Sequence, residues 1–432
     1  MDSEERLITR RGLLKTLGVA SGGLAVSGWI GAGSARAQEP SSAKLMETFT
    51  GPGANPHWNS VGPYITEPQK APLLLLTDRP VQIETPRHYF STAFTPNEAF
   101  YVRWHLDGIP NTVDLKEWRL QIEGNVAKPL TFSLPDLMQK FKAVSVAAVN
   151  QCSGNSRSRL ELRVAGGQWG NGAMGNAIWT GVRLRELLDL ASVKTGSLQV
   201  QFQGSETGSG PKNMASGRFM KSLDLTNPVL DQCVVAYLMN GEPLPLLNGF
   251  PVRLIVPGYF ATYWMKCLTW IRVLETVDEN FWMKPGYRIP DTPHGNTTPE
   301  EVKAGKVKMI PINKMPVRSF LISPDGSSKI PAGMTVTLRG IAFSGHGRVT
   351  RVEISEDDGK NWSGAKLGEE YGAYSFRTWE TPWTAKTPGK YSVAVRATDE
   401  KGNTQMDEPI WNPGGYLWNR IEKQELVAGI AG

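Results

Sequence analysis

Cys152 lies where an apolar run ends and a polar turn begins, a position from which a side chain can do chemistry. The run 144–149 predicts a strand that would hold the cysteine rigidly, and Gly154 and Asn155 tolerate tight or left-handed backbone conformations. Arg157 adds a fixed positive charge nearby, which favours the thiolate over the thiol. The stretch therefore predicts a metal ligand or a nucleophile, with a buried structural cysteine beside an ordinary turn as the alternative.

A second stretch sets an arginine and a histidine two residues apart. The segment 100–105 is strand-like, so Arg103 and His105 point to the same face, and the turn residues 107–110 follow directly. Arginine binds oxyanions well because its guanidinium donates two parallel hydrogen bonds and does not lose its charge. This pair is therefore a candidate for binding an anion.

Three further motifs follow along the chain, and their order carries a resemblance. They are Asn248-Gly249-Phe250-Pro251-Val252-Arg253 with Val256-Pro257-Gly258, then Trp264-Met265-Lys266, then Tyr287-Arg288. Together with the two stretches above, they resemble the sulfite oxidase family of molybdenum enzymes, most closely its bacterial periplasmic sulfite dehydrogenases (sulfite:cytochrome c oxidoreductases). The resemblance runs from about Pro86 to about Glu422 and rests on the combined order, since no single motif would be specific.

The resemblance implies that Cys152 is a ligand of molybdenum. The family's cluster Cys-x-Gly-Asn-x-Arg is matched here by Cys152, Gly154, Asn155 and Arg157. In that family the metal is carried by a pterin dithiolene, and a soft, charged thiolate suits a metal that changes its oxidation state. The expected cofactor is therefore molybdenum-molybdopterin, with Cys152 as its protein ligand.

The resemblance also implies a catalytic pocket for sulfite. Arg103 and Arg157 match the family's anion-binding positions, and Arg420 is a looser third candidate near the C-terminus. His105 and Tyr287 are the expected polar partners of the substrate, because a phenol can donate one hydrogen bond, accept another and help to move protons. These five residues are the predicted catalytic set.

Family positions that bind the pterin and its phosphate form a second implied set. Arg253 and Lys266 would supply positive charge, Trp264 and Met265 would supply backbone contacts, and the strand 101–104 would lie alongside. Asn248 stands where vertebrate members have a histidine, so it can donate and accept but cannot become charged. Trp169 resembles a tryptophan of the pocket wall and fits a plain core position equally well. The predicted cofactor-binding residues are Tyr101, Val102, Arg103, Trp104, Cys152, Asn248, Arg253, Trp264, Met265 and Lys266.

The N-terminus predicts a signal peptide. Residues 9–15 read Thr-Arg-Arg-Gly-Leu-Leu-Lys, an uncharged run extends to Ile30, and Ala35-Arg36-Ala37 forms a small-x-small cleavage site. The run is too rich in Gly, Ala and Ser to favour a transmembrane anchor. Residues 1–37 are therefore expected to direct export of the folded, cofactor-loaded protein to the periplasm by the twin-arginine machinery.

Composition excludes several classes of protein. Without its predicted signal the chain keeps 42 basic and 38 acidic residues, a net charge of +4 that is too mild to indicate a nucleic-acid partner. Only three cysteines occur, which argues against a disulfide scaffold, and Cys233 and Cys267 fit core positions. No Cys-x-x-Cys-His motif is present, so no covalent c-type haem is expected in this chain. The resemblance then implies a separate c-type cytochrome as electron acceptor.

Three parts are expected after the signal: an extended arm over 38–85, a catalytic cofactor-binding domain over 86–310 and a sandwich domain over 311–432. The catalytic domain alternates short β-rich runs with helices predicted over 134–141 and 184–191, which indicates an α+β, mixed-sheet fold, the sulfite oxidase fold. Strands predicted over 334–340, 349–355 and 391–398, with Trp362, Trp379 and Trp383 available for a core, indicate an immunoglobulin-like β-sandwich. The resemblance implies that this sandwich mediates a homodimer.

Three other functions compete with sulfite oxidation. A sulfane dehydrogenase of the sulfur-oxidising system shares the cysteine motif and the export route. A periplasmic protein-methionine-sulfoxide reductase shares the cofactor but usually lacks the C-terminal sandwich. A secreted, non-enzymatic binding protein would explain the sandwich and the signal, and would leave the cysteine, arginine and pterin motifs as coincidence.

Overall fold

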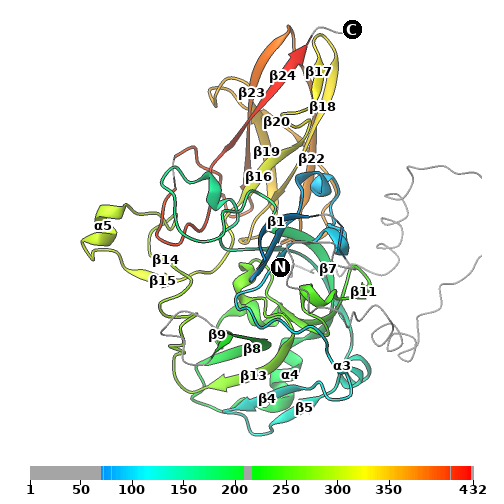
Figure 1. Ribbon diagram of the computed structural model, residues 1–432, viewed down its shortest axis with the longest axis vertical. Helices are drawn as coiled ribbons and strands as arrows, with labels where there is room; N and C mark the ends of the chain where they lie inside the picture. Colours follow the sequence, from blue (N-terminus) through cyan, green and yellow to red (C-terminus); the bar gives the residue numbers. More distant parts are fainter. Residues whose placement is uncertain (1–69, 72, 79, 209–216, 409, 430–432) are drawn as a thin grey trace, which may run out of the picture.

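The computed structural model describes residues 70–429 except 72, 79, 209–216 and 409. The predicted signal peptide 1–37 and part 38–69 of the predicted arm lie outside these residues. In Figure 1 the described chain forms a lower lobe of sheets with short helices and an upper lobe of strands that leads to the C-terminus. Among the described residues, no helix is long and apolar enough to span a membrane.

One five-stranded sheet of the lower lobe carries Cys152 at the end of its edge strand. That strand, β6, is antiparallel to β7, and its side chains are buried from Ala147 to Gln151. The apolar run predicted over 144–149 is thus a strand, and it delivers Cys152 to the end of the sheet. The strands are β6 (Val144–Gln151), β7 (Met174–Arg183), β10 (Val234–Met239), β11 (Glu242–Pro243) and β12 (Arg253–Ile255).

A second sheet in the lower lobe is mixed, as predicted. Its strand β13 (Leu268–Leu274) runs parallel to β4 and antiparallel to β8. The other strands are β4 (Leu120–Gly124), β5 (Leu130–Phe132), β8 (Gln199–Thr207) and β9 (Arg218–Asp224). The predicted α+β class with mixed sheets is therefore confirmed.

Two helices pack between these sheets. α4 (Leu184–Ala191) has the predicted bounds and contacts β4 and β7. α3 (Leu134–Lys140) contacts β5 and β7, and it begins at a capping box in which the Ser133 Oγ accepts the Asp136 N–H at 3.2 Å. Apolar residues spaced for one helical face, such as Leu184, Leu187 and Leu188, are buried.

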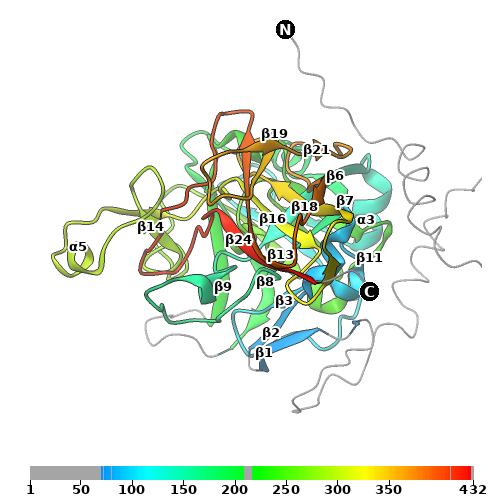
Figure 2. The same cartoon turned by 90° about the horizontal axis from the view of Figure 1, so that it is seen from above.

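Short elements connect the two lobes. The hairpin β1 (Leu74–Asp78) and β2 (Val81–Glu84) adds β3 (Val102–Arg103) as its third strand, so the end of the predicted arm pairs with the segment that carries Arg103. In Figures 1 and 2, α5 (Pro299–Lys303) and the pair β14 (Arg288–Pro290) and β15 (Met309–Pro311) project to one side of the body. Single-turn helices are η1 (Arg87–Ser91), η2 (Asn97–Ala99), η3 (Arg157–Arg159), η4 (Pro228–Asp231), η5 (Leu246–Asn248) and η6 (Ala261–Tyr263).

The upper lobe is a two-layer β-sandwich, as predicted. One sheet has the order β16-β18-β22-β21, with β16 (Arg318–Ser323), β18 (Thr335–Phe343), β22 (Arg377–Thr384) and β21 (Lys366–Leu367). The other has the order β17-β24-β23-β19-β20, with β17 (Lys329–Pro331), β24 (Glu422–Gly429), β23 (Gly389–Asp399), β19 (Val349–Ser355) and β20 (Ser363–Gly364). Apolar side chains from both sheets form one core with Trp379 and Trp383. Trp362 is half-buried outside this core, where the Arg396 guanidinium lies 4.1 Å from its ring centroid.

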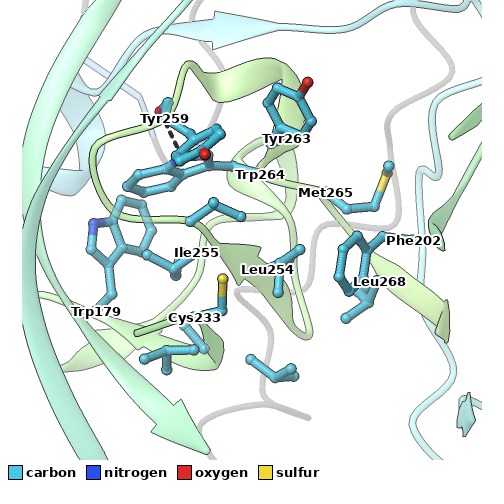
Figure 3. Packing of buried hydrophobic residues seen from close by; sticks show 14 of the residues in the cluster. Trp179, Phe202, Cys233, Leu254, Ile255, Tyr259, Tyr263, Trp264, Met265 and Leu268 are labelled. Atoms are coloured by element: carbon cyan, nitrogen blue, oxygen red, sulfur yellow. Dashed lines mark hydrogen bonds between the residues drawn. The ribbon is translucent and has the colours of Figure 1, made fainter. Parts of the chain in front are cut away.

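Cys233 is a core thiol, as its sequence context indicated. Figure 3 places it near Trp179, Leu254 and Ile255, and its side chain is fully buried. Burial raises the pKa of this thiol far above its ordinary value, so Cys233 is neutral and chemically inert.

A buried carboxylate, Glu422 on β24, joins the two lobes beneath the cysteine loop. Its oxygens pair with Arg87 at 2.9 Å and Arg159 at 3.4 Å, and they accept a hydrogen bond from Asn171 at 2.8 Å. Arg318 lies 3.9 Å away and donates to Ser156 in the cysteine loop. Burial alone would raise the pKa of Glu422, but the three arginines lower it overall.

We expect Glu422→Gln to destabilise the protein by about 3 kcal/mol at neutral pH, because three arginines would be left around a neutral amide. The depressed carboxyl pKa means that this stabilisation is present above the ordinary glutamate pKa and is lost as the pH falls through the folded-state value. The difference between the two proteins should therefore shrink in acid. Denaturant unfolding at several pH values measures it. Glu425→Gln on the same strand, where the carboxylate pairs with Lys390 at the surface, is the control and should change little.

Candidate molybdenum and anion site

The loop after β6 fixes the Cys152 backbone through hydrogen bonds. The Cys152 N–H donates to the Ala173 carbonyl at 2.9 Å, and its own carbonyl accepts the Asn155 N–H at 3.0 Å. The Asn155 side chain accepts the Ala173 N–H at 3.0 Å and donates to Asn171. Ser156 has a positive φ of 66°, which turns the chain sharply. The thiol is partly exposed, unlike those of the other two cysteines.

Arg157 clamps this loop to two other segments. Its Nη1 donates to the Gly167 carbonyl at 2.9 Å, while Nη2 and Nε donate to the Gly414 carbonyl at 2.9 and 3.2 Å. The approach needs glycine, because a Cβ on Gly154 would lie 2.5 Å from the guanidinium and Gly415, at φ +61°, faces it as well. Arg157 thus uses three donors to hold the loop in place.

Arg103 reaches the pocket from β3. Its strand pairs with β2, and its Nη1 is shielded from solvent with no hydrogen-bond partner among the described residues. Burial alone would lower the pKa of Arg103, but Tyr287 and Cys152 raise it overall, so the guanidinium stays charged. A shielded cation with a free donor is suited to bind an anion.

His105 lies next to Arg103 as a neutral imidazole. Its ring stacks on Phe219 at a centroid distance of 3.4 Å and meets the edge of Tyr287 at 5.6 Å. Burial, and then the charges of Arg103, Lys266 and Lys221, hold the pKa of His105 well below its ordinary value. This histidine can therefore exchange hydrogen bonds with a ligand without adding charge.

Tyr287 faces these groups from the segment before β14. Its φ of 53° lies in the left-handed region that side-chain-bearing residues rarely adopt, and its carbonyl accepts the Ile312 N–H at 2.9 Å. Burial raises the pKa of the Tyr287 phenol well above its ordinary value, with Arg103 opposing the shift. The hydroxyl therefore stays protonated and can donate a hydrogen bond.

Tyr416 was not predicted from the sequence, and it packs against Tyr287. Its ring stacks on that of Tyr287 at a centroid distance of 5.7 Å, and the Arg157 guanidinium lies 5.5 Å from its centroid. The Asn412 side chain holds the turn by accepting the Tyr416 N–H and donating to the Tyr416 carbonyl. The Pro-Gly-Gly sequence before Tyr416 signals a turn, but nothing in it indicates that the turn meets a pocket more than a hundred residues away.

Arg253 and Lys266 carry positive charge to the other side of the pocket. The Arg253 guanidinium lies 5.1 Å from the Trp179 ring centroid and donates to the Asn248 carbonyl at 2.8 Å. Lys266 lies 4.5 Å from the centroid of Trp104. Burial lowers the pKa of Arg253 to about 10 and that of Lys266 to about 8, although the nearby Glu206 carboxylate opposes the shift of Lys266.

Asn248 and Tyr101 join this group by direct hydrogen bonds. Asn248 Nδ2 donates to the Tyr101 carbonyl at 3.0 Å, and Asn248 Oδ1 accepts from the Lys70 ammonium. The Tyr101 hydroxyl donates to Asn150 Oδ1 at 2.7 Å. The Asn248 side chain therefore hydrogen-bonds both a buried ammonium and a backbone carbonyl in this chain.

The remaining predicted residues lie around this group, with one exception. Val102, Trp104, Trp264 and Met265 are buried beside it, and Trp169 is a core residue whose ring meets Tyr101 edge-on at 6.4 Å.

Arg420 is not brought into the pocket. It pairs with Glu161 at 2.8 Å at the surface and donates to the Asp407 carbonyl.

These side chains line one cavity, and its chemistry fits an anionic, polar cofactor. The described residues that line it include the cations of Arg103, Arg253 and Lys266 and contain no carboxylate. Six of them carry a buried polar atom without a hydrogen-bond partner among the described residues, which is costly unless a ligand provides one. Those six are Arg103, His105, Asn150, Ser153, Arg253 and Thr262. A pterin with its phosphate offers the missing acceptors and negative charge, and the Cys152 thiol in the same cavity offers a metal ligand.

We expect Tyr287→Phe to lower turnover of the loaded protein about tenfold, while metal content and melting temperature stay close to wild type. The substitution keeps the ring and its stack on Tyr416, and removes one hydrogen-bond donor beside charged groups. Turnover and metal per chain should be measured on the same preparation. Full turnover with full metal would make Tyr287 a structural aromatic and would move proton handling to His105.

Comparison with known proteins agrees with this chemistry. Residues 105–282 match the oxidoreductase molybdopterin binding domain, and residues 309–425 match the Mo-co oxidoreductase dimerisation domain. Mitochondrial sulfite oxidase of Mus musculus is 32% identical over 402 residues, which cover 88% of this chain and 71% of the mouse protein. The NADH nitrate reductase of Spinacia oleracea is 31% identical over 76% of this chain and 37% of its own length.

A solved structure gives the same fold. The sulfane dehydrogenase SoxCD of Paracoccus pantotrophus aligns with 85% of this chain and 90% of its own, at a TM-score of 0.69 and 24% identity. The fold, the two matched domains and the sequence similarity agree, and they imply a molybdenum-molybdopterin cofactor. The chain therefore belongs to the sulfite oxidase family of molybdenum enzymes.

Proposed function

We propose that this protein oxidises sulfite to sulfate and passes the electrons to a separate c-type cytochrome. The observation that carries the proposal is the pocket itself, whose described lining holds the Cys152 thiol, the unpartnered guanidinium donor of Arg103 and further cations, while the nearby Glu206 carboxylate accepts the backbone N–H groups of His105 and Leu106. Such a pocket attracts a small oxyanion and holds it beside a thiolate-bound metal.

The chain's own residues divide the work of holding the cofactor. Cys152 would ligate the metal, and Arg253 and Lys266 would neutralise the phosphate and hydrogen-bond the pterin, supported by Tyr101 and Asn248. When bound, the group supplies the oxygen atom that sulfite gains and takes up two electrons. The unpartnered donors of Arg253 and Asn150 are the contacts that the cofactor would complete.

Substrate positioning falls to the other side of the pocket. Arg103 would hold the sulfite oxyanion by charge-assisted hydrogen bonds, while the neutral His105 and the protonated Tyr287 would complete its polar shell. Arg157, with three donors already committed to carbonyls, would contribute its charge and fix the loop of Cys152. Tyr416 would hold the ring of Tyr287 in place through its stack.

The cellular setting forms part of the same proposal. The twin-arginine pattern at residues 9–15 supports export of the folded protein to the periplasm. The match of residues 309–425 to a dimerisation domain supports a homodimer. The sequence has no Cys-x-x-Cys-His motif, which supports a separate cytochrome as the acceptor.

One experiment distinguishes sulfite from the rival substrates. The sequence similarity to sulfite oxidases favours sulfite, whereas spinach nitrate reductase has nearly the same identity and SoxCD shares the fold. Molybdenum-loaded protein should be given sulfite or a protein-bound sulfane with oxidised cytochrome c, and nitrate or methionine sulfoxide with a reduced dye. We expect kcat/KM for sulfite to exceed the others at least a hundredfold. A higher value for any other substrate would replace sulfite in the proposal.

A further inference from the structure

A buried lysine, Lys221 on β9, lies behind Tyr287, and the only part given to it so far is its contribution to the low pKa of His105. Its side chain is fully buried, and its Nζ donates to the Trp282 carbonyl at 2.8 Å. The Nζ also lies 4.7 Å from the ring centroid of Tyr263 and 5.6 Å from that of Tyr287. In the described part of the chain Nζ forms no ion pair with a carboxylate, because Asp278, whose charge acts on it, accepts hydrogen bonds from Ser222 and Gln201. A buried ammonium without a paired carboxylate is costly, so its retention needs a reason.

The strand places Lys221 directly behind the two polar partners of the substrate. Side chains two residues apart share one face of a strand, and Phe219 on that face stacks on His105 while Lys221 faces the ring of Tyr287. One face of β9 therefore lies behind both His105 and Tyr287. The ammonium faces the ring of Tyr287, lowers the pKa of His105 through its charge, and is not among the residues that line the cavity.

We propose that Lys221 is a positioning residue whose ammonium charge, held behind Tyr287, sets how tightly the pocket binds an oxyanion. The cation facing the ring polarises the phenol, which strengthens its hydroxyl as a donor, and it adds positive potential to a cavity that excludes water. The inference rests on the proposed function, because it concerns the anion that the same pocket binds.

The charge of Lys221 changes near neutrality. Burial lowers the pKa of Lys221 to about 7, with Asp278 opposing the shift and Arg288 adding to it. Asp278 is itself committed to hydrogen bonds from Ser222 and Gln201. The phenols of Tyr263 and Tyr287 also face Lys221, and burial raises their pKa values. His105 is coupled to the same ammonium, and its pKa is held well below the ordinary value by burial and by the cations around it. The ammonium is therefore charged below neutral pH and loses its charge above it, so anion binding should weaken as the pH rises through this range.

Sulfate binding tests the inference, because sulfate keeps its double charge across this range whereas sulfite itself takes up a proton near neutrality. Calorimetry on molybdenum-loaded protein should compare Kd for sulfate between about pH 6 and about pH 8.5 in wild type, Lys221→Gln, Lys221→Met and Lys221→Arg. Gln keeps a donor near the Trp282 carbonyl without the charge, Met removes both, and Arg keeps the charge at every pH. Sulfite turnover is measured on the same preparations.

We expect the wild-type Kd to rise about tenfold from the acidic to the alkaline end, as loss of one partly screened charge implies. Lys221→Gln and Lys221→Met should bind more weakly than wild type at the acidic end and show a smaller rise in Kd, with Lys266, whose pKa is about 8, as the source of the remaining pH dependence. Lys221→Arg should show the same smaller rise and bind more tightly than wild type at the alkaline end. Gln and Met variants that follow the wild-type pH curve would overturn the inference and assign the pH dependence to another group. Failure of the proposed function would appear separately, as sulfate binding without sulfite turnover in wild type.

Discussion

Cys152→Ser should abolish sulfite oxidation while leaving the protein folded. A hydroxyl is a hard, protonated donor and a poor substitute for a soft thiolate on a metal that changes oxidation state, so we expect turnover to fall by at least about a thousandfold. The substitution adds no bulk to a partly exposed loop whose backbone hydrogen bonds to Ala173 and Asn155 are kept. Turnover, bound molybdenum and melting temperature should be measured together.

Cys233→Ala is the matched control for this result. Cys233 is fully buried in the core of the lower lobe and is not among the residues that line the pocket, so its loss should cost some stability and leave turnover per bound molybdenum unchanged. Wild-type turnover in Cys152→Ser would remove Cys152 from the metal. Equal losses of turnover in both variants would indicate a general effect of removing a thiol.

Arg103→Gln should lower kcat/KM for sulfite ten- to a hundredfold. The variant loses one charge-assisted contact, worth about 1.5 to 3 kcal/mol, which converts to one to two orders of magnitude in rate. The guanidinium is shielded from solvent and its Nη1 has no partner among the described residues, so little stability should depend on it. Steady-state kinetics with sulfite and molybdenum analysis measure the effect.

Arg272→Gln offers a control at a surface ion pair. Arg272 on β13 pairs with Glu123 and is partly exposed, so its removal should leave kcat/KM within about twofold of wild type. Unchanged sulfite kinetics in Arg103→Gln, with molybdenum intact, would remove Arg103 from the substrate site and leave Arg157 as the other candidate for binding the anion.

The local features of the fold were predictable because their signals are local. α4 has its predicted bounds, and α3 ends at Lys140, one residue before the predicted end. The strand 349–355 was also correct, since alternation over seven residues between turn signals determines a half-buried strand. Trp362 was misplaced, because its size indicated a core position while its neighbours at 361 and 363 are exposed and leave the ring half-buried.

The parts of the site that escaped prediction depend on contacts between distant segments. Tyr416 meets Tyr287 across 129 positions of sequence, and Lys221 lies behind the pocket only because β9 forms the edge of the mixed sheet. The role of Arg157 was also predicted only in part. Its motif marked it as an anion-binding residue, but its carbonyl partners at Gly167 and Gly414 appear only once the chain is folded.

The stoichiometry of sulfite oxidation tests the central claim most directly. Conversion of sulfite and water to sulfate releases two electrons and two protons, so each sulfate formed should accompany the reduction of two molecules of cytochrome c. Sulfate and reduced cytochrome should be quantified for preparations that contain different amounts of molybdenum. We expect a constant ratio of one sulfate to two reduced cytochromes and a rate proportional to molybdenum content. Sulfite-dependent reduction that is independent of molybdenum, or no sulfate from fully loaded protein, would contradict it.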